Sequence, residues 1–286
     1  MPTAMALLSR DEKRSLKRNG FVILHGAMDD DIVEPAREAV WDALPYGPDD
    51  YAAQAAADDT LRIRDDIEDP EPFGAVNDWL FERAEELYGA DGLQPPGDRI
   101  TLALKTPTGR QREGDEYPPP HRAHGHIDGY GPHFTNHKNV ANYAVLVTAY
   151  LEDVEPGGGG FTVWPGSHWY ASEYYRSNHL ESLVGNPTQP GLVLDDDGQW
   201  TGDFDQCTEY GNQFDALEAT GNAGTVVIWH QNLMHTGGTN LSPNIRMAAI
   251  NRFGHEDREE RRRDERENPW KYWDGMQDVS LTYPAD

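Results

Sequence analysis

The stretch that decides the fold is TVVIWHQNLMHTGG, residues 225–238. Its first five residues, 225–229, form an apolar run rich in β-branched side chains, which predicts a buried strand. His235 follows this strand closely and lies beside Gly237 and Gly238. We therefore expect the His235 imidazole at the mouth of a buried strand.

Short β-rich runs surround this stretch. Clusters of Gly, Pro, Asn and Asp separate them, which is typical of an antiparallel sandwich or jelly roll. The predicted class is mainly β with flanking helices, and the predicted core is a double-stranded β-helix (jelly roll, cupin-like). The predicted strands of this core are residues 100–105, 142–151, 160–165, 191–194, 225–230 and 246–253.

Helical patterns come before the β-rich part. Ser9 with Glu12 has the spacing of a capping box, and Gly20 ends the helix that they begin. A short strand at 21–24 and helices at 29–44 and 75–88 follow from apolar spacing. We expect one domain over 1–286, with a helical N-terminal part at about 1–98, the core at about 99–254 and a charged C-terminal tail at about 255–286. In that tail, residues 256–267 are most simply a solvated helix or tail. Two long polar segments, 106–122 and 195–211, are predicted loops, and the first is the candidate lid.

Charge and composition exclude several classes of protein. Fifty acidic residues against 24 basic ones give a net charge of −26, which argues against nucleic-acid binding. No apolar run approaches the roughly 20 residues that cross a bilayer. The absence of a secretory signal pattern and the single cysteine, Cys207, favour a cytoplasmic location.

The same acidity suggests a salt-adapted protein. At about 1 M salt the screening length falls to about 3 Å, and repulsion between the acidic groups largely disappears. The alternative is an ordinary acidic protein from a low-salt cell.

The pair His126 and Asp128 is a candidate for metal binding. Alternate residues of an extended chain project from the same face, so the imidazole and the carboxylate converge. Alone, the pair also fits a surface turn. His235 lies 109 residues after His126 and completes a set of two imidazoles and one carboxylate. This set is the facial triad of non-haem iron(II) oxygenases. Two of the three open positions suit a keto acid, and the last suits dioxygen.

A keto acid such as 2-oxoglutarate has a far carboxylate that needs a cation. Arg246, 11 residues after His235, opens the predicted strand 246–253. A guanidinium binds a carboxylate through two parallel hydrogen bonds and keeps its charge when buried. The alternative is a salt bridge at the barrel rim. Four further cations close to the triad are expected to attract an anionic substrate: Lys105, Arg110, Arg112 and Arg122.

Taken with their order, these residues resemble the phytanoyl-CoA dioxygenase family. The resemblance spans about 16–253 and implies a jelly roll with N-terminal helices, Fe(II) as the metal, and hydroxylation of an unactivated carbon. Four features carry it: Asn19-Gly-Phe-Val-Ile-Leu24, His126-x-Asp128, Glu155-Pro-Gly157 leading through Phe161 to Pro165-Gly-Ser-His168, and His235 followed by Arg246.

The sequence departs from the family pattern in two places. Family members often have a serine two residues after the distal histidine, where this chain has Gly237. Thr236 or Thr239 is expected to take over its part in binding the co-substrate carboxylate. Ile127 replaces a common glutamine. Because Asp128 is present, the family's halogenating variants, which lack this carboxylate, are disfavoured.

The sequence therefore predicts an Fe(II)- and 2-oxoglutarate-dependent dioxygenase that uses O2 and acts on a small organic or acyl substrate. It predicts no nucleic-acid or membrane partner, and it makes no prediction of oligomeric state. Two other classes stay open. A cupin-like metal enzyme without 2-oxoglutarate would have no need for Arg246, and a non-catalytic jelly-roll binding protein would have no need for intact metal ligands.

Overall fold

The computed structural model of the chain defines the fold over most of its length. The structure describes residues 8–57, 62–64, 71–96, 100–107, 127–128, 143–169, 171–172, 193–194, 200–201, 216–265 and 267–281. Three predicted features therefore lie wholly or almost wholly outside the described residues: the candidate lid at 106–122, the loop at 195–211, and His126.

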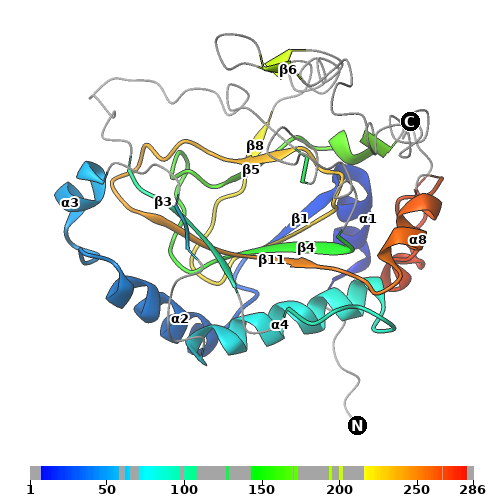
Figure 1. Cartoon of the computed structure of the whole chain (residues 1–286), viewed down its shortest axis with the longest axis horizontal. Coiled ribbons are helices and arrows are strands. Elements are labelled where there is room, and N and C mark those ends of the chain that lie inside the picture. Colours follow the sequence, from blue (N-terminus) through cyan, green and yellow to red (C-terminus); the bar gives the residue numbers. More distant parts are fainter. Residues whose placement is uncertain are drawn as a thin grey trace.

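The core contains one large antiparallel sheet and one small antiparallel sheet that face each other (Figure 1). The large sheet has the order β1 (Phe21–Leu24), β9 (Val226–Trp229), β4 (Val145–Tyr150), β11 (Arg246–Phe253), β3 (Thr101–Lys105) and β2 (Arg62–Arg64). The small sheet has the order β10 (His235–Gly237), β5 (Phe161–Val163) and β8 (Leu217–Glu218). A separate two-stranded sheet joins β6 (Val193–Leu194) and β7 (Trp200–Thr201).

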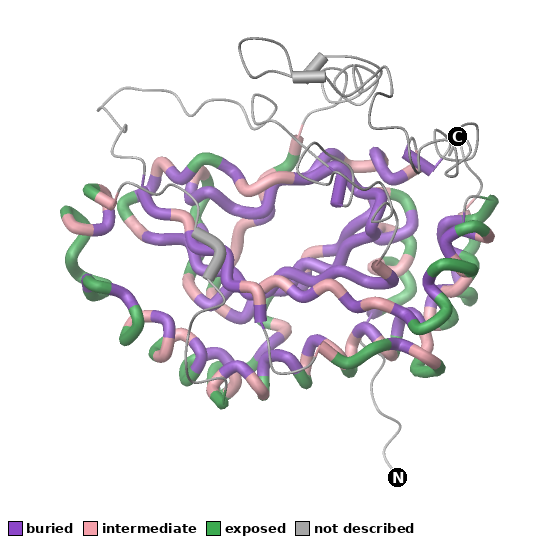
Figure 2. The backbone as a smooth tube through the Cα atoms, viewed as in Figure 1, coloured by how far each residue is buried: buried purple, intermediate pink, exposed green. Residues whose placement is uncertain are grey.

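Alternate residues of the large sheet feed two different apolar cores. On β4, Val145 and Val147 pack in the core beneath the helices, whereas Leu146 and Tyr150 pack in the core between the two sheets. This is the period-2 alternation of a strand that is covered on both faces. The inner core also contains Trp229 and other residues of both sheets, so it joins them (Figure 2).

Helices α2 (Asp30–Ala43) and α4 (Glu71–Tyr88) lie along the outer face of the large sheet (Figure 1). Helix α1 (Arg10–Asn19) lies beside β1, and α3 (Tyr51–Ala56) lies at the opposite end of the molecule. The capping box of Ser9 and Glu12 is confirmed, as is the left-handed Gly20 at the end of α1. Helix α4 begins at Glu71, before the predicted residue 75, and α3 was not predicted. Within the described residues, no helix is long and apolar enough to cross a membrane.

The predicted class, mainly β with flanking helices, is confirmed by these sheets and helices. Strand β11 has the predicted bounds, and β3 begins one residue later than predicted. Strands β8 and β10 were not predicted because each has only two or three residues and β10 ends in glycine. Such short strands form when neighbouring chain pairs with them, and their own residues give little signal.

The charged C-terminal segment was predicted to be a solvated helix or tail. Part of it is a helix, but one side of this helix is buried and not solvated. The segment forms α8 (Arg258–Asp264) and a 3₁₀ turn, η3 (Asp274–Met276). Arg258, Arg262 and Glu265 are buried, as are Trp270 and Trp273. Ion pairing allows the charged groups to be buried, and the tryptophans anchor the segment against the rest of the chain.

Gly20 lies at the junction of α1 and β1 in a conformation that other residues rarely adopt. Its φ is +84°, and a Cβ there would lie 2.5 Å from His168 Nδ1 and 2.9 Å from Leu233 Cδ1. Gly26 has a φ of +58° but no heavy atom within 4 Å of its Cβ position, so it is a matched control.

We predict that Gly26→Ala lowers the free energy of unfolding by about 1–2 kcal/mol, the cost of a left-handed backbone. Gly20→Ala should cost about 1–3 kcal/mol more because the added methyl overpacks a buried junction. Urea denaturation at one fixed salt concentration measures both. Equal losses in the two variants would show that the junction accommodates a methyl group.

Candidate active site

Asp128 and His235 approach each other in the interior of the protein. Only 8% of Asp128 and 4% of His235 is exposed. His235 Nε2 lies 3.6 Å from Asp128 Oδ1. Two donors that share one metal through bonds of about 2.1 Å lie about 3–3.6 Å apart. The pair therefore has the spacing that a common metal ion requires.

The ring of His235 is fixed in both orientation and protonation. Its Nδ1 lies 2.9 Å from the carbonyl oxygen of Leu233, which can only accept a hydrogen bond. A neutral ring therefore carries its proton on Nδ1, and Nε2, which faces Asp128, is the nitrogen that would bind a metal. The ring packs 4.3 Å from Trp229 and 5.3 Å from Phe161, measured between ring centroids. This is the state in which an imidazole binds a metal.

The donor set fits a ferrous ion as far as the structure describes it. One imidazole nitrogen and one carboxylate oxygen are two of the three ligands of a facial triad. Within the described residues, no group of three His, Cys, Asp or Glu side chains could hold a metal. The predicted third ligand, His126, precedes the described residues 127–128, so its role stays a prediction.

A pair of cations lies at one end of this site. Arg246 is opposite Lys105 in the pairing of β11 with β3. Arg246 donates from Nε to Gly159 O (3.1 Å) and from Nη1 to Ala103 O (2.8 Å), and only 4% of the residue is exposed. Lys105 Nζ donates to Gly237 O (2.7 Å). Lys105, predicted to attract substrate, therefore lies beside Arg246, predicted to bind the co-substrate. The other predicted cations, Arg110, Arg112 and Arg122, lie outside the described residues.

Burial and the neighbouring guanidinium weaken the proton affinity of Lys105. Burial is the larger cause, the charge of Arg246 adds to it, and the carboxylate of Glu218 opposes both; together they lower the pKa of Lys105 to about 8. Burial also lowers the pKa of Arg246, although a guanidinium stays charged at neutral pH. Two adjacent buried cations are costly unless an anion lies between them.

Gly237 occupies the position at which the resemblance led us to expect a serine, and the two cations border this position. A Cβ at this position would lie 3.0 Å from Arg246 Nη2 and 3.6 Å from Lys105 Nζ. The two cations therefore already border the place that a serine side chain would occupy. Thr236 lies on the opposite face of β10 from His235 and Gly237, and Thr239 is exposed, so neither is placed as Lys105 is.

The carboxylate of Glu218 holds the glycine-rich turn that borders Arg246. It accepts hydrogen bonds from Gly157 N (2.7 Å) and Gly160 N (2.8 Å). Between them, Gly159 has a φ of +78° and supplies the carbonyl that receives Arg246 Nε. The glycines are thus needed for a tight turn whose backbone orients the guanidinium.

The motifs that carried the family resemblance make hydrogen bonds to the segment 230–234, which directly precedes His235. Ser167 Oγ accepts from Met234 N (2.8 Å), and Trp164 N donates to Met234 O (3.1 Å). Gly20 O accepts from His230 N (2.8 Å), and His168 donates from Nε2 to Lys17 O (3.0 Å). These contacts fix both ends of the segment 230–234, which leads directly into His235, the predicted metal ligand.

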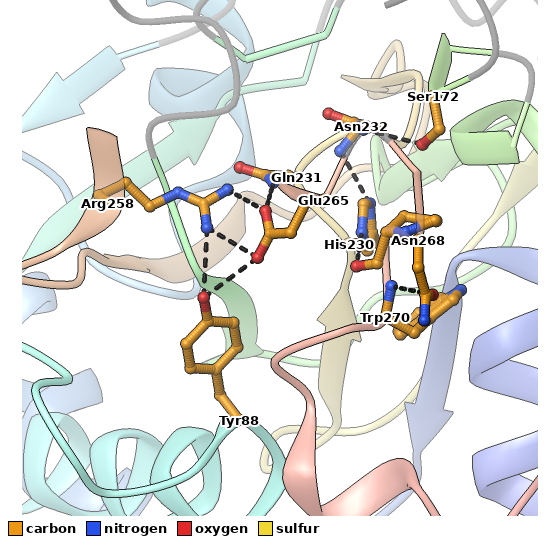
Figure 3. Close-up of polar contacts among 10 residues, drawn as sticks. Tyr88, Ser172, His230, Gln231, Asn232, Arg258, Glu265, Asn268 and Trp270 are labelled. Atoms are coloured by element: carbon orange, nitrogen blue, oxygen red, sulfur yellow. Dashed lines mark hydrogen bonds and ion pairs between the residues drawn. The ribbon is translucent and has the colours of Figure 1, made fainter. Parts of the chain in front are cut away.

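The C-terminal segment braces the same stretch (Figure 3). Glu265 receives two hydrogen bonds from Arg258 (2.9 and 2.6 Å), one from Tyr88 (3.1 Å) and one from Gln231 (2.9 Å). His230 donates from Nε2 to Pro269 O (3.1 Å), and its Nδ1 accepts from Asn232 N. Burial lowers the pKa of His230 to about 3, so the ring is neutral.

Taken together, the buried imidazole, carboxylate and cation pair are side chains of the kinds that a metal-dependent oxygenase site requires. The comparisons with known proteins agree. The family model for phytanoyl-CoA dioxygenase (PhyH) matches residues 16–248, and the chain belongs to this family. The expected cofactors, Fe(II), 2-oxoglutarate and O2, are those of the family.

Solved structures share the fold at low sequence identity. EctD from S. alaskensis with bound Fe is 19% identical with a TM-score of 0.54, covering 89% of this chain and 79% of EctD. The carbocyclase SnoK of nogalamycin biosynthesis is 18% identical with a TM-score of 0.56, covering 91% and 93%. The epimerase SnoN of the same biosynthesis is 18% identical with a TM-score of 0.52, covering 86% and 81%. No curated protein matched the sequence.

We predict that Glu265→Gln lowers the free energy of unfolding by about 3–5 kcal/mol, because Arg258 would stay buried without a counter-charge. Tyr88→Phe removes one neutral group from the same carboxylate and should cost about 1 kcal/mol. Urea denaturation measures both variants. If Glu265→Gln loses less unfolding free energy than Tyr88→Phe, then Glu265 does not brace the segment 230–234.

Proposed function

We propose that this chain is an Fe(II)- and 2-oxoglutarate-dependent dioxygenase that hydroxylates an unactivated carbon of a small organic or acyl substrate. The observation that carries the proposal is the buried pair of Lys105 and Arg246 beside Gly237, two residues after His235 on β10, whose ring faces Asp128. We further propose that the two sheets are the described part of a complete double-stranded β-helix within one domain over 1–286.

In this proposal His126, Asp128 and His235 hold the iron. When bound, iron with 2-oxoglutarate and dioxygen supplies the oxidant that removes a hydrogen atom from the substrate and returns hydroxyl, with succinate and carbon dioxide as the other products. The chain's own residues bind, orient and exclude water. Trp229 and Phe161, packed on the ring of His235, are the described side chains that keep water from that ligand.

Lys105 and Arg246 bind the far carboxylate of 2-oxoglutarate. Arg246 uses Nε and Nη1 for backbone carbonyls, and its Nη2 borders the Gly237 position together with Lys105 Nζ. A carboxylate at that position would receive charge-assisted hydrogen bonds from both cations. In our proposal this role falls to Lys105, which replaces the family serine. No contact of the described residues gives it to Thr236 or Thr239.

The alternatives have less support. A cupin-like metal enzyme without 2-oxoglutarate, or a non-catalytic binding protein, would keep two buried like charges together with the carboxylate of Glu218 to offset them but no bound anion between them. The names of the structural neighbours nevertheless include an epimerase and a carbocyclase, and one EctD structure contains 2-oxoglutarate and 5-hydroxyectoine. Hydroxylation is therefore one of several oxidative outcomes that this fold supports.

Anaerobic titration of the Fe(II)-loaded protein with 2-oxoglutarate tests the proposal. We expect a visible charge-transfer band from the chelated keto acid, followed by succinate when air is admitted. Arg246→Met and Lys105→Met should each weaken 2-oxoglutarate binding about 10- to 100-fold, the value of a lost hydrogen bond between charged groups. Lys271→Met, which removes an exposed lysine, is the matched control and should bind as the wild type does.

The pH dependence gives an independent check. Lys105 loses its charge as the pH rises through its pKa of about 8, so 2-oxoglutarate binding by the wild type should weaken about 10-fold between pH 7 and pH 9.5. Lys105→Met should remove most of this dependence. Iron binding without any charge-transfer band would favour the cupin-like alternative, and an unchanged affinity in Lys105→Met would assign the carboxylate elsewhere.

We also propose that the protein is salt-adapted. The chain has only five lysines, and the acidic residues at the start of α2, Asp29, Asp30 and Asp31, are all exposed. Because screening reduces their repulsion, the melting temperature should rise as potassium chloride is increased toward about 1 M. A melting temperature that falls steadily with added salt would reject this proposal.

A further inference from the structure

Strand β11 carries a second arginine on the face that bears Arg246. Arg252 lies six residues further on, and an even separation puts both side chains on the same side of a strand. At about 3.4 Å per residue the two positions lie about 20 Å apart along β11. One strand therefore borders the site from the co-substrate cations at one end to Arg252 at the other.

Arg252 contacts the predicted metal-binding carboxylate directly. Its Nε donates to Asp128 Oδ2 in a short ion pair. The other oxygen, Oδ1, is the one that lies 3.6 Å from His235 Nε2. The two oxygens of Asp128 thus have different partners, and the carboxylate is held in one orientation.

We propose that Arg252 is a positioning residue that presents only Oδ1 of Asp128 to the metal. The inference rests on the proposed function and extends it to a residue beyond the matched family region, which ends at residue 248. With Oδ2 bound to Arg252, the carboxylate binds the metal through one oxygen. The positions that the keto acid and dioxygen need then stay open.

The choice of arginine fits this role. The planar Nε–H of a guanidinium directs the carboxylate as a flexible ammonium group does not. A purely structural ion pair is the alternative. Against it, 27% of the Arg252 side chain is exposed, compared with 9% of that of Asp128, so solvent screens the guanidinium and reduces what the pair contributes to stability. Its loss should therefore affect the metal more than the fold.

Cobalt(II) binding to the metal-free protein tests the proposal without turnover. We expect Arg252→Gln to weaken Co(II) affinity about 10- to 100-fold, as losses of partners of metal ligands do, and to change the visible d–d bands of the bound ion. Arg252→Lys should recover part of the affinity. Arg14→Gln, which removes an exposed arginine from an ion pair on α1, is the matched control and should bind Co(II) as the wild type does.

A second measurement separates Arg252 from Arg246. At saturating Fe(II), Arg252→Gln should bind 2-oxoglutarate within about threefold of the wild type, whereas Arg246→Met should lose that affinity and keep its Co(II) affinity. Thermal melting of each variant should stay within a few degrees of the wild type. If Arg252→Gln does not fold, Arg252→Lys carries the test through its altered d–d bands.

The outcomes distinguish this inference from the proposed function. Wild-type affinity and an unchanged Co(II) spectrum in Arg252→Gln would overturn the role of Arg252, while the charge-transfer band of the wild type would still support the oxygenase. A wild type that binds no metal would overturn both.

Discussion

The hydrogen bond from His235 Nδ1 to the carbonyl of Leu233 is the interaction on which the site depends. It sets the tautomer of the imidazole and directs Nε2 toward Asp128. A hydrogen bond between two residues so close in the chain holds the ring in place only if the backbone around them is itself fixed. Gly20, Ser167 and the C-terminal residues Glu265 and Pro269 fix it from three separate parts of the chain. Much of the molecule therefore serves to hold one segment of six residues.

This convergence gives a physical reason for the family motifs. The Asn-Gly-Phe and Pro-Gly-Ser-His elements touch neither Asp128 nor Arg246 among the described contacts. They meet each other behind the segment 230–234, where Gly20 leaves room for the His168 ring that a side chain would displace. Their part in the chemistry is indirect, because they determine where the imidazole of His235 lies.

The sequence predicted much of this arrangement and missed what depends on register. The runs 225–229 and 246–253 predicted strands, and Arg246 lies at the start of β11 as expected. Lys105 was assigned to steering substrate, because nothing in a single strand shows that it pairs opposite Arg246. The one sequence feature that could have indicated its role is that Lys105 ends an otherwise apolar strand. The buried side of α8 was missed for a similar reason. Arg258 and Glu265 pack against Tyr88, which is 170 residues before Arg258 in the chain.

The central claim is that one pocket joins a metal held by His126, Asp128 and His235 to a carboxylate held by Lys105 and Arg246. The most direct test is a crystal structure of the protein with Fe(II) and 2-oxoglutarate, prepared without oxygen. The account predicts metal bonds to all three side chains and the far carboxylate of the keto acid within hydrogen-bond distance of Lys105 Nζ and Arg246 Nη2. A metal bound without His235, or a keto acid that leaves the two cations without an anion, would contradict it.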